Sequence, residues 1–220
     1  MAKKKTDEPK VYKEHPSVDQ RITDTLRENY MPYAMSVIVS RAIPEIDGFK
    51  PSHRKLLYTM YKMGLLNGNR TKSANIVGQT MKLNPHGDAA IYETMVRLTR
   101  GNEALLMPFV DSKGNFGKVY SRDMAYAAPR YTEAKLDAFC AELFRDIDTD
   151  AVDFVDNYDG EMKEPTLWPT TYPDILVSAN TGIAVGMASN FCGFNLAEVC
   201  RTTIELIKNP EHDILSTLPA

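Results

Sequence analysis

The chain has 220 residues, enough for one large domain or two small ones, and its 43% hydrophobic content is sufficient for a real core. A formal net charge of -3 and a pI near 5.8 exclude a uniformly basic protein, so any contact with nucleic acid must be local. Cys140, Cys192 and Cys200 are odd in number and have no metal-type spacing, which predicts reduced thiols rather than a disulfide framework.

The N-terminus predicts a cytoplasmic protein without membrane contact. Lys3, Lys4 and Lys5 precede no apolar core, so the segment is not a signal peptide. The longest apolar run, around Met35 to Val39, is too short to span a bilayer. Residues 1–16 are charged and contain proline, and we expect them to form a disordered tail.

The first helix is predicted to begin at Ser17. Ser17 is followed three residues later by Gln20, the spacing of a capping box. Pro32 is expected to limit or kink the helix, and an apolar segment from Tyr33 to Ala42 follows. Side chains at helical spacing form one stripe: Ile22, Leu26 and Tyr30.

A second helix is predicted after the loop Pro44–Gly48, with Pro51 in its first turn. Lys50, His53 and Arg54 lie near its start and could reach a phosphate at the helix N-terminus. For His53, taken alone, an ordinary surface or core histidine is the favoured interpretation. The expected buried face consists of Leu56, Leu57, Met60 and Met63.

Residues 72–100 have the pattern of a helix, a tight turn and a second helix. The first helix is expected over Lys72 to Leu83 and the second over Ala89 to Arg100, with Asp88 as its N-cap. Between them, Asn84-Pro85-His86-Gly87 breaks the helical pattern. This arrangement is typical of a helix-turn-helix, although any pair of antiparallel helices would look similar.

Charge favours the DNA-binding interpretation. No Asp or Glu stands between Asp47 and Asp88, and the usual reason for such a basic segment is neutralisation of phosphates. The alternative is a solvated basic face without a partner. The interval contains His53, His86 and the cations Lys50, Arg54, Lys55, Lys62, Arg70, Lys72 and Lys82.

The next segment predicts a β-wing and another helix. Leu105 to Val110 followed by Asp111 to Gly117 is expected to form a strand and a glycine turn. A helix is expected from Thr132 to about Phe144, with Leu136, Cys140 and Phe144 facing inward.

An acidic stretch from Asp146 to Glu164 marks a boundary into a more β-rich part. Ile175 to Val177 and Gly182 to Met187 are expected to be buried strands. Asn195 is expected to cap a last helix through Ile207, which the Asn209-Pro210 pair would stop. The final residues complete no element, as in a truncated chain.

Seven segments of the chain carry a family resemblance: Tyr33–Ala42, Lys50–Arg54, Pro85–Asp88, Gly114–Gly117, Arg130–Glu133, Asp153–Gly160 and Gly182–Met187. They stand in the order seen in bacterial type IIA topoisomerases. The chain resembles the N-terminal part of the A subunit of DNA gyrase or topoisomerase IV, over nearly everything from about residue 17.

The resemblance implies an α+β fold with a winged-helix domain, a helix-turn-helix with a β-wing, followed by the start of an α/β tower domain. The expected divisions are a helical arm over 17–47, a winged-helix breakage-reunion domain over 48–150 and a truncated tower domain over 151–220.

The resemblance also selects a nucleophile. Tyr120, Tyr126 and Tyr131 all lie near the expected wing, and periodicity does not choose among them. By the family pattern Tyr131 attacks a DNA phosphodiester. A phenol is a weak nucleophile at its ordinary pKa, so the site must stabilise charge on the phosphate. Arg130 is expected to donate to phosphate oxygens, while Arg41 and His86 match residues that line the same site.

Further positions match residues that bind DNA or drugs in the family. Ile183 matches an apolar wedge inserted between base pairs, although by itself it has the pattern of an ordinary strand core residue. Ala89 and Glu93 match the drug-contact positions of quinolones. The expected contacts to the DNA backbone are Lys50, His53, Arg54, Arg97 and Thr181.

The implied activity is that of an ATP-hydrolysing type II DNA topoisomerase, which breaks both strands transiently through a 5′-phosphotyrosine. The implied partners are double-stranded DNA, the B subunit, and a second copy of the A subunit, in an A2B2 complex at the nucleoid. The B subunit would hold Mg²⁺ in its toprim domain and bind ATP, so this fragment alone should be inactive. The alternative is a non-catalytic winged-helix DNA-binding regulator, which would prefer a particular operator sequence.

Overall fold

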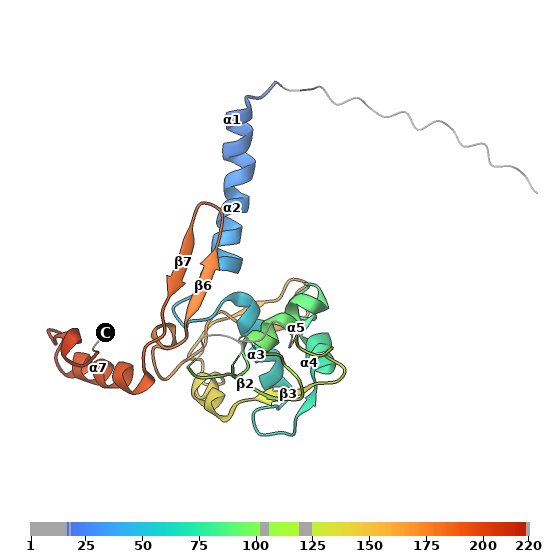
Figure 1. Ribbon diagram of the computed structural model, residues 1–220. Helices are drawn as coiled ribbons and strands as arrows, with labels where there is room; N and C mark the ends of the chain where they lie inside the picture. Colours follow the sequence, from blue (N-terminus) through green and yellow to red (C-terminus); the bar gives the residue numbers. More distant parts are fainter. Residues whose placement is uncertain (1–16, 18, 102–105, 119–124, 219–220) are drawn as a thin grey trace, which may run out of the picture. The chain divides into compact units, whose positions relative to one another are not determined.

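The computed structural model describes residues 17, 19–101, 106–118 and 125–218 (Figure 1). The tail predicted for residues 1–16 and the candidate Tyr120 lie outside these described residues. The chain divides into two units, Met1–Tyr33 and Ala34–Ala220. The second unit contains both helices and antiparallel strands, which confirms the α+β class predicted from the sequence.

The first helix begins at Ile22, so the capping box predicted at Ser17 is wrong. Arg21 occupies the N-cap position and offers no side-chain cap. The Gln20 side-chain amide instead donates to the Glu28 carboxylate at 2.8 Å, and not to a group at the start of the helix. The helical segments are α1 (Ile22–Thr25), the π-helical η1 (Leu26–Tyr30), α2 (Met31–Val37) and the π-helical η2 (Ile38–Ala42).

Pro32 does not end this helix. It is the second residue of α2, just after the π-helical segment η1. A proline disrupts the hydrogen bonds of an α-helix, but in a π-helix these are already replaced by bonds with a longer spacing. The predicted stripe is exposed: Ile22, Leu26 and Tyr30 keep 70%, 52% and 48% of their surface accessible.

The second unit is built around three helices that pack against one another: α3 (Pro51–Lys62), α4 (Ser73–Thr80) and α5 (Asp88–Arg97). Lys50 is the N-cap of α3 and Pro51 its first residue, as predicted. The expected apolar face is confirmed, with Leu56, Leu57 and Met60 fully buried and Met63 partly buried.

The helix pair α4–α5 is shorter than predicted at three of its ends. α4 starts at Ser73 and stops at Thr80 rather than Leu83, and α5 stops at Arg97 rather than Arg100. Asp88 is the first residue of α5, not its N-cap, and its carboxylate accepts from the Ala89 N–H at 2.8 Å.

A three-stranded antiparallel sheet has the order β1 (Thr71–Lys72), β3 (Glu133–Leu136), β2 (Val110–Lys113). The helix predicted from Thr132 is therefore wrong. Its first part is the central strand β3, and only η3 (Ala138–Cys140) and α6 (Ala141–Phe144) are helical. Ala134 and Leu136 alternate inward at the strand period, while Leu136, Cys140 and Phe144 are buried as expected.

The strand predicted before Gly114 starts only at Val110, and Leu105 lies outside the described residues. Beyond the sheet come two hairpins and a final helix. The elements are β4 (Phe154–Asp156) with β5 (Lys163–Pro165), η4 (Asp174–Leu176), β6 (Asn180–Ile183) with β7 (Ala188–Phe191), α7 (Leu196–Lys208) and η5 (Ile214–Ser216).

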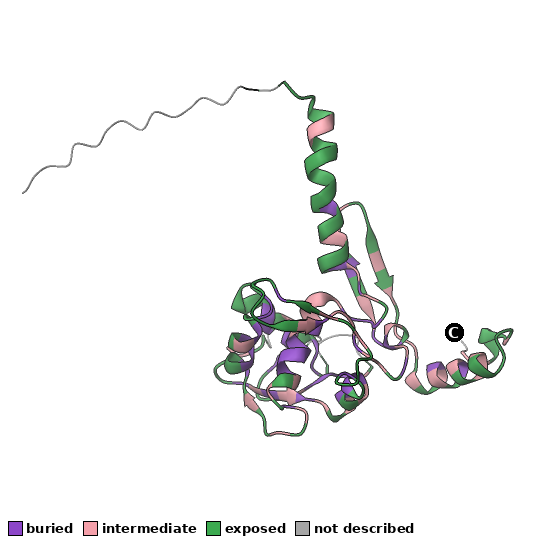
Figure 2. Ribbon diagram, turned by 180° about the vertical axis from the view of Figure 1, so that it is seen from behind, coloured by how far each residue is buried: buried purple, intermediate pink, exposed green. Residues whose placement is uncertain are grey.

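Two buried strands predicted in this region are wrong. Ile175 and Leu176 lie in η4, because the Asp174 carbonyl accepts from the Val177 N–H and closes a turn. The segment Gly182–Met187 does not form one strand: it contains the end of β6 and the turn into β7. Figure 2 shows this hairpin as mostly exposed or half-buried.

Asn195 caps α7 as predicted, with its side-chain oxygen accepting from the Ala197 and Glu198 N–H groups at 2.9 and 3.4 Å. None of the helices in the described part of the chain is long and apolar enough to cross a membrane. Aromatic contacts tie the loops to the helical core, including an edge-on pair between Phe49 and Phe109 with ring centroids 5.0 Å apart.

Candidate nucleic-acid interface

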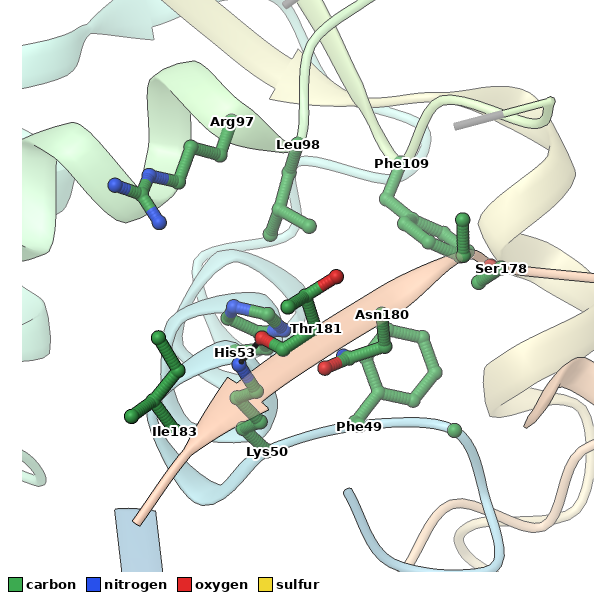
Figure 3. A pocket seen from close by; sticks show the side chains of 12 residues that line it. Phe49, Lys50, His53, Arg97, Leu98, Phe109, Ser178, Asn180, Thr181 and Ile183 are labelled. Atoms are coloured by element: carbon green, nitrogen blue, oxygen red, sulfur yellow. Dashed lines mark hydrogen bonds between the residues drawn. The ribbon is translucent and has the colours of Figure 1, made fainter. Parts of the chain in front are cut away.

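A pocket of about 360 Å³ gathers five of the six residues predicted to contact DNA (Figure 3). Lys50 caps α3, His53 lies in its first turn, and Arg97 ends α5. Thr181 and Ile183 come from β6, and Thr181 lies 131 residues after Lys50 in the chain. Three separate elements therefore place cationic, polar and apolar groups around one hollow.

The apolar floor of this pocket includes Phe49, Leu98 and Phe109, which are almost fully buried. Burial in this environment, together with the nearby charges of Lys50, Arg97 and Arg54, lowers the pKa of His53 to about 3. His53 is consequently neutral at pH 7 in the free protein, although it lies near three cations.

Lys50 and Arg97 each make a contact within the chain. The Lys50 ammonium donates to the carbonyl of Thr181 at 2.8 Å, which joins the start of α3 to β6. The Arg97 guanidinium donates to the Glu93 carboxylate at 2.9 Å, one helical turn earlier. Both members of this second pair are at least half exposed, so the pair can rearrange around a ligand.

Ile183 is not the strand core residue that it would be by pattern alone. It keeps 83% of its surface accessible at the end of β6. An exposed isoleucine beside cationic groups suits insertion between base pairs, the role that the resemblance implied.

Arg54, the sixth predicted contact, does not line the pocket. Its guanidinium forms two hydrogen bonds of 2.8 Å to the Asp47 carboxylate and a third of 3.1 Å to the Phe49 carbonyl. The Arg54 and Asp47 side chains are 7% and 1% exposed. Asp47 also accepts from the Phe49 and Trp168 N–H groups, so the ion pair organises the loop before α3. Sequence reasoning missed Asp47, whose signal was its place directly before the basic segment.

A second cavity, of about 770 Å³, brings Arg41 and His86 together. Arg41 comes from η2 and His86 from the turn between α4 and α5, and both side chains are exposed. Lys55 also lines this cavity: its ammonium lies 3.1 Å from a Glu164 carboxylate oxygen and donates to the Leu83 carbonyl at 3.1 Å.

Tyr131 does not line this second cavity. Tyr131 is 65% exposed, and the Arg130 guanidinium lies over its ring with 4.7 Å between the guanidinium carbon and the ring centroid. Arg130 thus contacts the aromatic face of Tyr131 and is positioned beside its phenol. Tyr126, the nearest alternative in the described chain, is 44% exposed.

A buried set of hydroxyl groups holds the backbone next to Tyr131. The Thr132 hydroxyl lies 2.9 Å from the Tyr92 oxygen and donates to Ser73 at 2.8 Å, and the Tyr92 hydroxyl donates to the Ala127 carbonyl at 2.8 Å. Burial raises the pKa of Tyr92 and keeps it neutral, although the Thr132 contact opposes this shift. Nothing in the spacing of these residues predicted the network.

The positions matched to drug contacts lie on the exposed start of α5. Ala89 and Glu93 are one helical turn apart, and the Glu93 carboxylate is engaged by Arg97. The part of the chain that the structure describes contains no group of three or more His, Cys, Asp and Glu side chains that could hold a metal ion.

Comparison with known proteins defines the class to which this fold and interface belong. Residues 41–220 match the family of the DNA gyrase/topoisomerase IV A subunit, and the chain therefore belongs to this family. This confirms the resemblance carried by the seven segments.

Two similar curated proteins are, by name, A subunits of DNA gyrase. The protein of Staphylococcus epidermidis is 47% identical over 196 residues, which are 88% of this chain and 22% of the relative. That of Staphylococcus aureus is 46% identical over 199 residues, 89% of this chain and 22% of the relative. The chain thus spans about a fifth of the length of these relatives.

Proposed function

We propose that the chain is the DNA-binding and DNA-cleaving part of a type IIA topoisomerase A subunit. The observation that carries this proposal is the convergence of Lys50, His53, Arg97, Thr181 and Ile183 on one pocket. Cations suit a DNA backbone, and an exposed apolar wedge suits a bent duplex. In this proposal α4, α5 and the sheet form a winged helix within residues 48–150, and residues 151–220 begin a tower domain.

Tyr131 is the proposed nucleophile. Its phenolic oxygen forms a bond to phosphorus while the bond to the 3′ oxygen breaks; the phenol loses a proton and the leaving oxygen gains one. Arg130, already against the Tyr131 ring, is placed to donate to the phosphate. We assign charge stabilisation to Arg41 and positioning of phosphate or proton to His86, which share a cavity.

The whole activity would need partners. We propose an A2B2 assembly acting on double-stranded DNA in the cytoplasm, with ATP bound by the B subunit. The described residues fit no metal site, so the Mg²⁺ that family members use is assigned to the B subunit, and no step here depends on a metal held by this chain. Each A subunit would supply one Tyr131, and two copies would cut the two strands.

The test uses the full-length A subunit with its B subunit, Mg²⁺ and a DNA duplex, and measures protein covalently attached to DNA after denaturation. Wild type should form the adduct and Tyr131→Phe should form none. Tyr126→Phe is the matched control, since Tyr126 is also exposed and lies in the same segment. An adduct with Tyr131→Phe would contradict the assignment. Binding restricted to one operator sequence, without an adduct, would indicate a regulator instead.

A further inference from the structure

Gly182 brings the backbone of β6 directly against the end of η2. A methyl group on Gly182 would lie 2.9 Å from the Ala42 carbonyl carbon and closer still to its oxygen, distances that real side chains do not adopt. Both residues are buried. The glycine is required here by the close approach of two backbones.

The preceding peptide of the same strand is fixed as well. The carbonyl of Thr181 accepts from the Lys50 ammonium at 2.8 Å, and Lys50 is the N-cap of α3. Two consecutive residues of β6 therefore contact two different elements. Gly182 packs against Ala42 of η2, and Thr181 accepts a hydrogen bond from Lys50 of α3.

The close approach of Gly182 and Ala42 joins the residue before the exposed wedge, Ile183, to the residue after the candidate site residue Arg41. Ile183, 83% exposed, follows Gly182 directly. Arg41, which lines the second cavity with His86, directly precedes Ala42. A displacement of the wedge strand thus reaches Arg41 through a single backbone contact.

We propose that Gly182 is a positioning residue that couples insertion of Ile183 into DNA to the placement of Arg41. The inference rests on the proposed function and adds to it a route by which DNA bending is sensed. Closely packed backbone cannot be compressed, so load on Ile183 passes through Gly182 to Ala42. A misplacement of about 1 Å at a reacting group can lower a reaction rate roughly 10²-fold. A small shift of Arg41 would therefore make cleavage of a kinked duplex faster than cleavage of a straight one.

The test measures hydrogen exchange at residues 38–43 of the full-length A subunit, with and without a saturating DNA duplex. The Ile43 N–H, which donates to the Ile38 carbonyl at 3.2 Å, reports on the end of η2. Duplex should slow this exchange in wild type, and Ile183→Ala should abolish the slowing. Gly182→Ala should abolish it too, at a duplex concentration that saturates the variant.

A second readout is covalent adduct with Mg²⁺ and the B subunit present. Ile183→Ala and Gly182→Ala should each lower its yield about tenfold, and the double variant no further, because both break one route. Gly193→Ala is the matched control: its methyl group would lie 2.6 Å from the Val177 carbonyl oxygen, a similar clash away from Ala42. Gly193→Ala should keep the slowed exchange.

Full slowing in Gly182→Ala, or adduct losses that multiply in the double variant, would overturn the coupling. If Gly182→Ala does not fold, Ile183→Ala at saturating DNA takes its place, because the exposed Ile183 side chain can be shortened without a clash, and retention of full slowing there would overturn the coupling equally. If duplex slows the exchange in wild type but no covalent adduct forms, the assignment of Tyr131 as nucleophile is wrong. The coupling through Gly182 would still hold.

Discussion

Arg54 and Asp47 are buried together and share two hydrogen bonds of 2.8 Å. We predict that Asp47→Asn lowers the free energy of unfolding by about 3–5 kcal/mol, since it leaves the guanidinium charge buried without a counter-ion. Glu93→Gln is the control: the exposed Glu93–Arg97 pair should contribute under about 1 kcal/mol. Urea unfolding of both variants measures the difference. Equal losses would show that burial does not set the cost of breaking these pairs.

His53 should make stability depend on pH. Its pKa falls from 6.5 to about 3 on folding, because burial and the nearby cations disfavour the charged form. Between these values the unfolded chain binds more protons, so the contribution of His53 to the free energy of unfolding rises with pH and is lost on acidification. Asp174 opposes this slope, because burial raises its pKa from 3.8 to about 6.

The comparison of wild type with His53→Gln isolates the His53 contribution. We expect the difference in free energy of unfolding to increase from about pH 3 to about pH 6.5 and to level off above, since the neutral imidazole then prevails in both states. Urea unfolding across this range measures it. A flat difference would show that His53 titrates at its ordinary pKa in the folded protein.

The Tyr92 hydroxyl should position Tyr131 without touching DNA. Tyr92→Phe keeps the aromatic contacts with Phe116 and Tyr126 but loses the hydrogen bonds to Ala127 and Thr132. We predict adduct formation about tenfold slower at unchanged duplex affinity, because the loop carrying Tyr131, the proposed nucleophile, loosens. Thr132→Ser, which retains a hydroxyl, should keep nearly the wild-type rate in single-turnover cleavage. A wild-type rate in Tyr92→Phe would remove the network from the mechanism.

At the scale of elements, the helices predicted best from the sequence are those with a local signal at their start, such as a first-turn proline or a capping side chain. Pro51 starts α3 and Asn195 caps α7, and both signals act within a few residues. β3 could not be predicted in this way, because Glu133–Leu136 is a strand only between β1 and β2, which are distant in sequence. Spacing alone gave the inward side chains Leu136, Cys140 and Phe144 correctly, but it assigned Leu136 to a helix, whereas that residue lies in a strand.

The exposed start of α5 carries a prediction about quinolone drugs. By the family pattern, the magnesium-bound water of such a drug is held by a helix hydroxyl and a carboxylate at the positions of Ala89 and Glu93. Ala89 offers no hydroxyl, and the Glu93 carboxylate is engaged by Arg97. A hydrogen bond of this kind contributes about 1.5–3 kcal/mol, so Ala89→Ser should strengthen drug response about tenfold or more.

Drug-stimulated cleavage by the reconstituted enzyme, wild type against Ala89→Ser, measures this effect. Cleavage without the drug should be unchanged, because Ala89 has no role in the chemistry. An equal drug response in the two proteins would show that the hydroxyl does not control sensitivity here.

At the scale of the whole molecule, the interface shows what a sequence cannot supply. Lys50 and Thr181 meet across 131 positions of the chain, and no periodicity relates them. The family resemblance proposed both, and the structure brings them together. Arg54 shows the opposite case: a residue of the same basic segment is turned inward, because the buried Asp47 binds it. The charge pattern of the sequence located the basic segment. It could not distinguish the exposed cations of that segment from Arg54, whose buried ion pair has a structural role.

Two-fold symmetry gives the last prediction, which rests on the proposed function. If each A subunit supplies one Tyr131, an assembly with one wild-type and one Tyr131→Phe copy holds a single nucleophile. Heterodimers isolated with two different affinity tags and combined with the B subunit should therefore nick one strand of a supercoiled plasmid and leave no double-strand break. Gel electrophoresis after denaturation separates nicked from linear plasmid. If the heterodimer gives linear product at the yield of the wild-type homodimer, one tyrosine serves both strands. A full-length protein that sediments strictly as a monomer would contradict the symmetric assembly itself.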